Sequence, residues 1–318
     1  MPSNQNPLGA LPARFRRQRL LIVGCGDVGL RVVRALRHLS IHVRGPRVLA
    51  LTSSAARVPE LRAAGVTPLV GNLDRPASLA RLGGLATRVL HLAPPPGEKE
   101  LGPRWWLDAR SSALVRALRR RTPVQALVYA STSGVYGDCA GAWVSEARPL
   151  APATPRAQRR ANAEAAMRLL GRTGVRVSVL RVPGIYAGDR EGGTPHARLL
   201  RGTPVLAPQD DVYTNHIHAD DLARACLAAL WRGRAQRAYN VNDDSGMRMG
   251  DYFDLAADLY GLARPPRVTR SQAQQQLPLS LLSFMGESRR MENVRMKREL
   301  RLGLRYPSVR EGLADQRG

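Results

Sequence analysis

The chain of 318 residues has a formal net charge of +24, and 44% of its residues are hydrophobic. This length suits about two globular domains, and no segment approaches the roughly 20 apolar residues that a membrane helix requires. The three cysteines are scattered, with neither the spacing of a zinc site nor the even number of a disulfide framework, so we expect a cytoplasmic protein without a metal site.

The positive charge comes almost entirely from arginine, because Lys99 and Lys297 are the only lysines. The arginines are spread along the whole chain, whereas nucleic-acid-binding proteins usually concentrate positive charge on one face or tail. We therefore interpret the surplus as solvated surface charge, with attraction to phosphates or acidic substrates as the alternative. Nucleic acid is not an expected partner.

The first 183 residues predict a flexible arm followed by alternating strands and helices. Residues 1–17 are basic and show no periodicity. Strands are predicted at 20–24, 47–51, 67–70, 88–92, 126–131 and 175–181. Helices are predicted at 28–39, 56–64, 77–82, 106–121 and 157–170. This alternation indicates one domain, at 18–183, with a parallel sheet covered by helices on both faces.

Beyond residue 183 the rhythm loosens, and we predict a smaller C-terminal α/β substrate lobe at 184–318, partly interleaved with the first domain. Its elements are predicted to be a helix at 221–231, a strand at 238–241 and helices at 250–259 and 293–300. Stretches rich in proline and glutamine, at 264–267 and 272–278, are expected to separate them.

The strongest chemical signal is Leu-Leu-Ile-Val-Gly-Cys-Gly-Asp-Val-Gly at residues 20–29, where a GxGxxG motif joins an apolar strand to an amphipathic helix. Gly24 permits a tight turn, Gly26 lets a pyrophosphate approach the backbone, and Gly29 allows close helix packing. The motif predicts a Rossmann-type doubly wound α/β fold that binds NAD or NADP through Gly24, Gly26, Asp27, Val28 and Gly29. A purely structural turn is the alternative.

The end of the second strand bears on the choice of dinucleotide. NAD-binding proteins usually place an acidic residue about 20 positions after the glycines, against the ribose, but Leu51 is followed by Thr52, Ser53 and Ser54. Ser53, Ser54 and Arg57 could instead receive the 2′-phosphate, which favours NADP over NAD. Alternatively, residues 52–54 only cap the next helix.

The segment Tyr-Ala-Ser-Thr-Ser-Gly-Val-Tyr-Gly at 129–137 resembles the extended short-chain dehydrogenase/reductases, the NAD-dependent epimerase/dehydratase family. Other segments are similar to further motifs of the family and occur in the same order as there: 71–74, 91–93, 180–186, 215–221 and 239–242. The resemblance covers about residues 18–310. The resemblance implies further cofactor contacts from these residues: Asn72, Leu73, Leu92, Ala93, Ser131 and Pro183.

The chain departs from the family at the reactive positions. Redox members use a tyrosine, a lysine four residues later and a Ser or Thr, as a proton relay. Here the resemblance places Thr132 at the Ser/Thr position but Arg156 and Arg160 where the tyrosine and lysine would stand. Arginine does not release its proton near neutral pH, so the chain resembles atypical members that lack the tyrosine. Val23 also replaces the first glycine of the usual GxxGxxG.

Three other side chains could exchange a proton if they reached the site: Tyr136, His216 and His218. The tyrosine of this family motif usually packs, however, and local hydrogen bonding is the alternative for the histidines. The two histidines would point to opposite faces of a strand, and no third residue completes a metal site.

Two pairs of neighbouring residues have more ordinary expected roles. Asp220 and Asp221 are predicted to cap and start the helix that follows them. Trp105 and Trp106 could line a pocket, although we expect one of them in the core.

Two functions remain in contention. The resemblance favours an NAD(P)-dependent oxidoreductase or epimerase acting on a sugar nucleotide or a small carbonyl compound. The loss of the tyrosine–lysine pair favours a non-catalytic NADP(H)-binding regulatory or redox-sensing protein. Family members often pair through the helices at 106–121 and 157–170, which are rich in arginine here, so the sequence leaves the oligomeric state open.

Overall fold

The computed structural model describes residues 18–39, 45–97, 104–121 and 124–315. The predicted arm at 1–17 lies outside these residues. No helix in the described part of the chain is both long enough and apolar enough to span a membrane.

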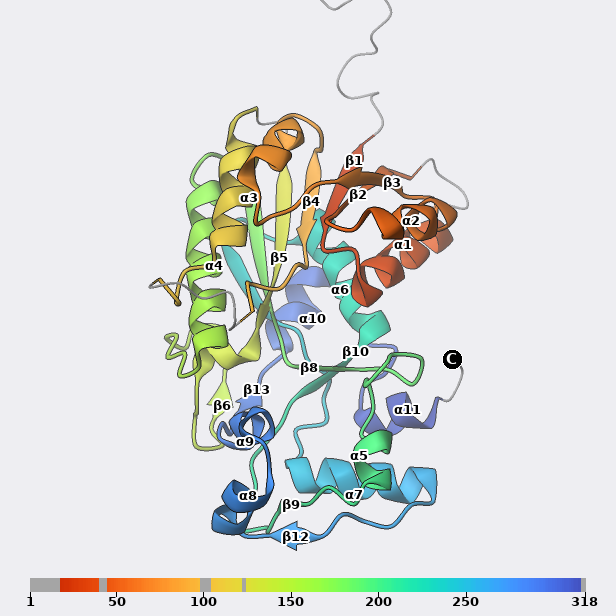
Figure 1. Cartoon of the computed structure of the whole chain (residues 1–318), viewed down its shortest axis with the longest axis vertical. Helices are drawn as coiled ribbons and strands as arrows, with labels where there is room; N and C mark the ends of the chain where they lie inside the picture. Colours follow the sequence, from red (N-terminus) through yellow and green to blue (C-terminus); the bar gives the residue numbers. More distant parts are fainter. Residues whose placement is uncertain (1–17, 40–44, 98–103, 122–123, 316–318) are drawn as a thin grey trace, which may run out of the picture.

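A parallel sheet is the centre of the molecule, and in the described residues it has seven strands in the order β11-β7-β5-β4-β1-β2-β3 (Figure 1). Its strands are β1 (Arg19–Val23), β2 (Arg47–Thr52), β3 (Thr67–Val70), β4 (Arg88–His91), β5 (Ala126–Thr132), β7 (Arg176–Val182) and β11 (Arg237–Asn240). The first six agree with the predicted strands to within one residue at each end. The seventh, predicted as an element of the smaller lobe, pairs with β7 at the edge of the main sheet.

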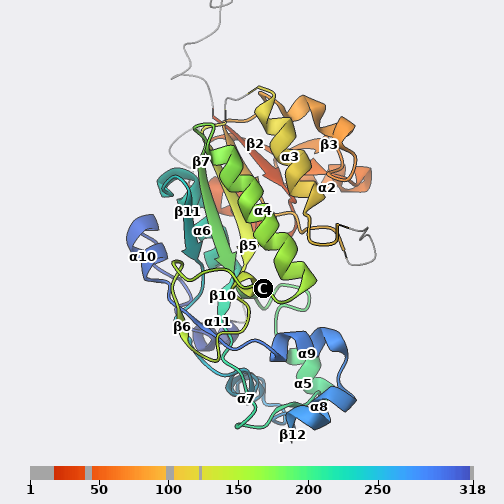
Figure 2. The same cartoon turned by 90° about the vertical axis from the view of Figure 1, so that its left-hand side faces the viewer.

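Helices cover both faces of the sheet, which confirms the predicted Rossmann-type α/β fold. One face packs against α1 (Asp27–Leu39), α2 (Val58–Ala63), α6 (Ala219–Arg232) and α10 (Val294–Leu300). The other packs against α3 (Ala109–Arg119), α4 (Pro155–Gly171) and the short helix η3 (Pro76–Leu82). Figure 2 shows α3 and α4 lying in front of the strands.

Three predicted helices differ from the structure in detail. The one predicted at 56–64 begins as a 3-10 turn, η2 (Ala55–Arg57), and continues as α2. The one predicted at 77–82 is entirely 3-10 in form. The one predicted at 106–121 starts only at Ala109, because the Asp108 carboxylate accepts a hydrogen bond from the Ser111 amide and caps the helix there.

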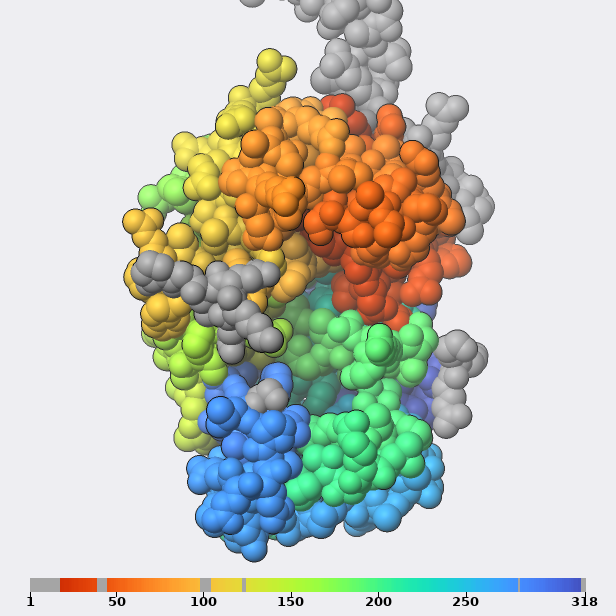
Figure 3. All heavy atoms as spheres, viewed as in Figure 1, coloured from red at the N-terminus to blue at the C-terminus, as the bar shows by residue number. Residues whose placement is uncertain are grey.

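A smaller group of elements lies below the carboxyl ends of the strands (Figure 1). Its helices are α5 (His196–Leu200), α7 (Met249–Tyr260), α8 (Arg270–Gln276), α9 (Leu279–Met285) and α11 (Val309–Ala314). Among the described residues, three two-stranded pairs accompany them: β8 (Gly184–Tyr186) with β10 (His216–His218), β9 (Val205–Leu206) with β12 (Arg267–Val268), and β6 (Trp143–Val144) with β13 (Arg290–Met291). The stretch at 272–278 does lie between α7 and α10, but it holds an unpredicted helix, since α8 occupies most of it behind a capping box at Thr269. The surface is hollowed between this group and the red-to-orange part of the main domain (Figure 3).

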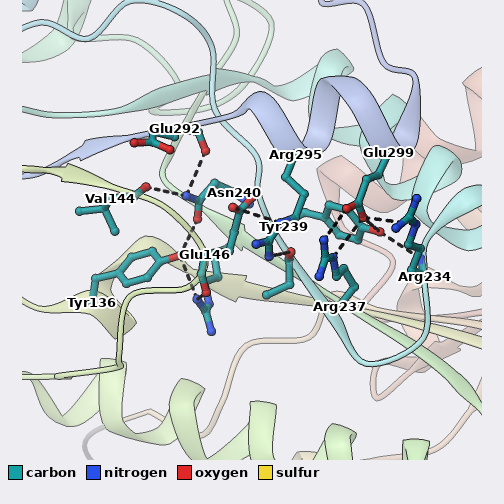
Figure 4. Close-up of polar contacts among 12 residues, drawn as sticks. Tyr136, Val144, Glu146, Arg234, Arg237, Tyr239, Asn240, Glu292, Arg295 and Glu299 are labelled. Carbon is teal, nitrogen blue, oxygen red and sulfur yellow. Dashed lines mark hydrogen bonds and ion pairs between the residues drawn. The ribbon is translucent and has the colours of Figure 1, made fainter.

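A polar network fixes the C-terminal segment to the edge of the sheet (Figure 4). The Asn240 side chain, at the end of β11, donates to the carbonyl oxygens of Val144 (2.9 Å) and Glu292 (3.1 Å), and accepts from the Tyr136 hydroxyl at 2.7 Å. One residue earlier in the strand, the hydroxyl of Tyr239 donates to the Glu299 carboxylate on α10 at 3.1 Å. Because buried polar groups must be paired, this network fixes where β6, α10 and the edge strand meet.

Candidate cofactor and substrate site

A cavity of about 580 Å³ opens at the carboxyl ends of β1, β2, β4, β5 and β7. It contains the gap between β1 and β4, where the strand order reverses, which is the usual ligand position in such sheets. Every residue predicted to bind the cofactor lines it: Gly24, Gly26, Asp27, Val28, Gly29, Thr52, Ser53, Arg57, Asn72, Leu73, Leu92, Ala93, Ser131 and Pro183. The three predicted reactive residues line it as well: Thr132, Arg156 and Arg160.

The three glycines of the loop differ in what surrounds them. Gly24 has φ +85°, and a Cβ there would lie 2.5 Å from the Ala93 backbone nitrogen, so only glycine fits this turn. A Cβ on Gly29 would lie 3.1 Å from the Cys25 sulfur, as expected where α1 packs closely on β1. A Cβ on Gly26, by contrast, would find no atom of the described residues within 4 Å. The loop is therefore open at Gly26, where a pyrophosphate would approach.

The end of β2 forms the second part of the cavity wall. The Thr52 hydroxyl accepts from the Ser54 amide at 3.2 Å, and Ser54 precedes η2 without a capping bond from its side chain. The capping alternative was therefore wrong. The Arg57 guanidinium donates to the Cys25 carbonyl oxygen at 2.8 Å and to both carboxylate oxygens of Glu60. It is thus held against the glycine loop, with Glu60 competing for its charge.

The turn after β3 closes this side of the cavity. The Asn72 side chain accepts from the Asp74 amide at 2.9 Å, and the Asp74 carboxylate receives two hydrogen bonds from Arg110, each 2.7 Å. Arg110 also lines the cavity, and the sequence did not single it out. The aspartate is thereby neutralised beside the site.

Thr132, Arg156 and Arg160 meet at the opposite end of the cavity. The Thr132 oxygen accepts from the Gly134 amide at 3.3 Å. Arg160 is buried and donates to the Ala130 carbonyl oxygen (2.8 Å) and the Tyr129 hydroxyl (3.1 Å). Arg156 is exposed, and in the described part of the chain it makes no hydrogen bond or ion pair; partial desolvation together with the nearby Arg160 lowers its pKa. Its guanidinium is therefore available to an anion.

A buried ion pair supports the floor beneath these residues. The Ser131 hydroxyl donates to Glu164 at 2.7 Å, and the Glu164 carboxylate receives two hydrogen bonds from Arg181, at 2.9 and 3.2 Å. Arg181 also donates to the Tyr136 hydroxyl at 2.9 Å. Because all four side chains are buried, this network fixes β5, β7 and α4 relative to one another.

The alternative proton donors do not reach the cavity. The buried ring of His216 stacks on Tyr252 with centroids 4.2 Å apart, and burial lowers its pKa to about 4. The ring of His218 lies 3.8 Å from that of Tyr306. Neither histidine lines the cavity, nor does the buried Tyr136. His218 makes the local hydrogen bond that was its alternative role, whereas in the described residues the buried Nδ1 of His216 has no hydrogen-bond partner and its ring only packs on Tyr252.

The predicted role of Asp220 and Asp221 was partly wrong. They lie in the first turn of α6, but the cap is His218, whose Nδ1 accepts from the Asp220 amide at 3.2 Å. The Asp221 carboxylate instead accepts from the amides of Arg305 and Tyr306, at 2.8–2.9 Å, and anchors the C-terminal segment.

The expectation of a buried tryptophan at 105–106 was also wrong. Trp105 and Trp106 are 39% and 47% exposed, and neither lines the cavity.

The family assignment follows from this fold and site. Residues 20–242 match the model of the NAD dependent epimerase/dehydratase family, and the chain belongs to that family. No curated protein sequence matches the chain significantly.

Solved structures of similar proteins support the fold. A functionally unknown conserved protein from Silicibacter pomeroyi DSS is 28% identical, with a TM-score of 0.76 and coverage of 94% of this chain and 98% of that one. A UDP-glucose 4-epimerase from Thermotoga maritima, solved with UDP-glucose, is 19% identical (TM-score 0.74, 93% and 96% covered). A UDP-glucuronic acid 4-epimerase from Bacillus cereus, solved with NAD, is 16% identical (TM-score 0.72, 93% and 96% covered).

Proposed function

We propose that this protein binds NAD or NADP in the cavity and acts as an oxidoreductase or epimerase on a sugar nucleotide or a small carbonyl compound, without the usual tyrosine–lysine pair. One observation carries the proposal: the glycine loop, Thr132 and the unpaired Arg156 line the same cavity. Similar folds that hold NAD or UDP-glucose support the choice of cofactor and substrate class.

The cavity offers a place for each part of a dinucleotide. The open loop at Gly26 and the amides at the start of α1 suit the pyrophosphate. Ser53 and Arg57 line the cavity at the end of β2 and would receive the 2′-phosphate of the adenosine ribose, which supports NADP over NAD in this proposal. When bound, the dinucleotide supplies the hydride acceptor or donor.

Thr132 and Arg156 have distinct roles in this proposal. Because the Thr132 oxygen already accepts from Gly134, its own proton is directed elsewhere and can be donated to a substrate oxygen. Arg156 binds a substrate phosphate or carboxylate, or stabilises negative charge that develops on a carbonyl oxygen. It does not move a proton, since an arginine stays protonated even with a lowered pKa. Arg160, which is held by hydrogen bonds to Ala130 and Tyr129, adds positive electrostatic potential at the end of the cavity where Thr132 and Arg156 lie.

A second candidate is a non-catalytic NADP(H)-binding regulatory protein. Among the described residues that line the cavity there is no tyrosine, histidine or lysine. Among those residues Cys25 carries the one thiol, and burial raises the pKa of this thiol to about 11. A site that binds a dinucleotide without a group that titrates near neutral pH suits a sensor of the bound cofactor.

A substrate screen with matched variants distinguishes the candidates. The purified protein, loaded with oxidised or reduced dinucleotide, is mixed with UDP-sugars and small aldehydes and ketones. Reduced-nicotinamide absorbance and product mass or stereochemistry are followed. We expect turnover that is lost in Thr132→Val and Arg156→Gln, whereas Arg172→Gln, an exposed site outside the cavity, retains it. Dinucleotide binding without turnover of any compound would favour the sensor.

A further inference from the structure

Five charged side chains form a compact cluster at the start of α1. Arg31 is 4% exposed and donates to Asp27 (2.9 Å), Asp220 (2.7 Å) and Asp189. Arg190 donates to the second oxygen of Asp27 at 2.8 Å. The partners come from α1, from the start of α6 and from the loop after β8. The cluster therefore joins three segments that are distant in sequence.

The loop after β8 is docked onto α1 by two consecutive residues of opposite charge. Asp189 pairs with Arg31, one turn into the helix, while Arg190 pairs with Asp27 at its first residue. In Figure 3 the green surface of this segment lies directly below the red surface of α1. A tight turn supports the arrangement, since the Gly193 amide donates to the Arg190 carbonyl oxygen at 2.9 Å. The turn thus fixes the backbone of Arg190, and Asp27 fixes its guanidinium.

The sign of the charge at this place is unusual for a phosphate loop. Asp27 lies within the GxGxxG motif, lines the cavity beside Gly26, and has a side chain that is 34% exposed. Two arginines and three aspartates give the cluster a formal charge of −1, which opposes a pyrophosphate. Arg190 also lines the cavity, and its side chain is 30% exposed. Without it the cluster would carry −2 beside the open loop.

We infer that Arg190 is a pyrophosphate-binding residue, supplied by the loop after β8 and held in place by Asp27. The guanidinium that caps the Asp27 carboxylate faces the same cavity as Gly26, and a guanidinium can bind a carboxylate and a phosphate oxygen with different N–H groups. The cofactor is then bound from two sides, by the backbone of the glycine loop and by this side chain. This inference rests on the proposed cofactor site.

The test is a calorimetric titration of NAD, NADP and ADP-ribose into five forms of the full chain: wild type, Arg190→Gln, Asp27→Asn, the double variant and Arg172→Gln. We expect Arg190→Gln to weaken the preferred dinucleotide and ADP-ribose alike, by about tenfold, with a shallower salt dependence. Arg172→Gln removes one exposed arginine outside the cavity and should change affinity by less than twofold. Asp27→Asn in the Arg190→Gln background should leave affinity at least about fivefold below wild type, because it removes the carboxylate that Arg190 neutralised but does not restore the contact between Arg190 and the phosphate.

The outcomes separate this inference from the proposed function. Wild-type protein that binds dinucleotides while Arg190→Gln binds equally well overturns the inference and leaves the proposed function standing. A double variant that regains wild-type affinity also overturns it, since Arg190 would then act only by neutralising Asp27. Wild-type protein that binds none of the dinucleotides overturns the proposed function itself. Melting of each variant without ligand shows whether the fold is intact.

Discussion

Replacing Gly26 by valine should separate folding from cofactor binding. Within the part of the chain that the structure describes, a Cβ at this position would find no atom within 4 Å, so we expect the free energy of unfolding to change by less than about 1 kcal/mol. The new side chain projects into the space that a pyrophosphate would fill. The pyrophosphate would then lose its contact with the backbone of the glycine loop. We expect affinity for the preferred dinucleotide to fall at least a hundredfold, or about 2.7 kcal/mol.

The matched control for this prediction is Gly24→Ala in the same loop. Gly24 has φ +85°, and its Cβ would lie 2.5 Å from the backbone nitrogen of Ala93. This variant should therefore lose about 2 kcal/mol or more of stability. Urea denaturation and calorimetry on both variants test the argument. A Gly26→Val variant that binds the dinucleotide like wild type would refute it, because the loop would then not contact the pyrophosphate.

Three further predictions address the floor of the cavity, the cofactor preference and the pH dependence of stability. Glu164→Ala leaves Arg181 buried and unpaired, so urea denaturation should show a loss of about 3–5 kcal/mol; a Glu164→Leu/Arg181→Met double variant no more stable than Glu164→Ala would contradict this. Arg57→Gln should weaken NADP binding about tenfold more than NAD binding, and Glu60→Gln, which frees Arg57, should strengthen NADP binding; equal effects on both dinucleotides in calorimetry would exclude a 2′-phosphate contact. Burial raises the pKa of Asp243 from 3.8 to about 7, so the stability that it contributes is complete below about pH 4 and is lost as pH rises through 7. Asp243→Asn should flatten the pH dependence of unfolding between pH 5 and 8, and an unchanged slope would count against this cause.

Strands and the glycine loop could be predicted because their signals are local. A buried parallel strand is a short apolar run, and β1 is such a run, followed directly by Gly24, whose positive φ excludes other residues. The six strands of the first domain were therefore located to within a residue. The order of motifs along the chain then placed residues as distant as Gly24 and Pro183 in one cavity.

Contacts between distant residues could not be predicted. Arg31 follows Asp27 by four residues, so their pairing on one helix face could have been anticipated. Its partners Asp189 and Asp220, however, are 158 and 189 residues away in sequence. The histidine cap of α6 was missed for a related reason: aspartate is the commoner cap, but Asp221 is engaged by the backbone at Arg305. Such choices are made by tertiary packing and have no local signal.

The central claim is that the cavity beside the glycine loop binds a nicotinamide dinucleotide. Its most direct test is a calorimetric titration of the purified wild-type protein with NADPH, NADP, NADH and NAD at moderate salt. We expect micromolar binding with one site per chain, tighter for the NADP pair. No heat of binding with any of the four, from protein shown to be folded, would contradict the claim and leave the glycine loop as a structural turn only.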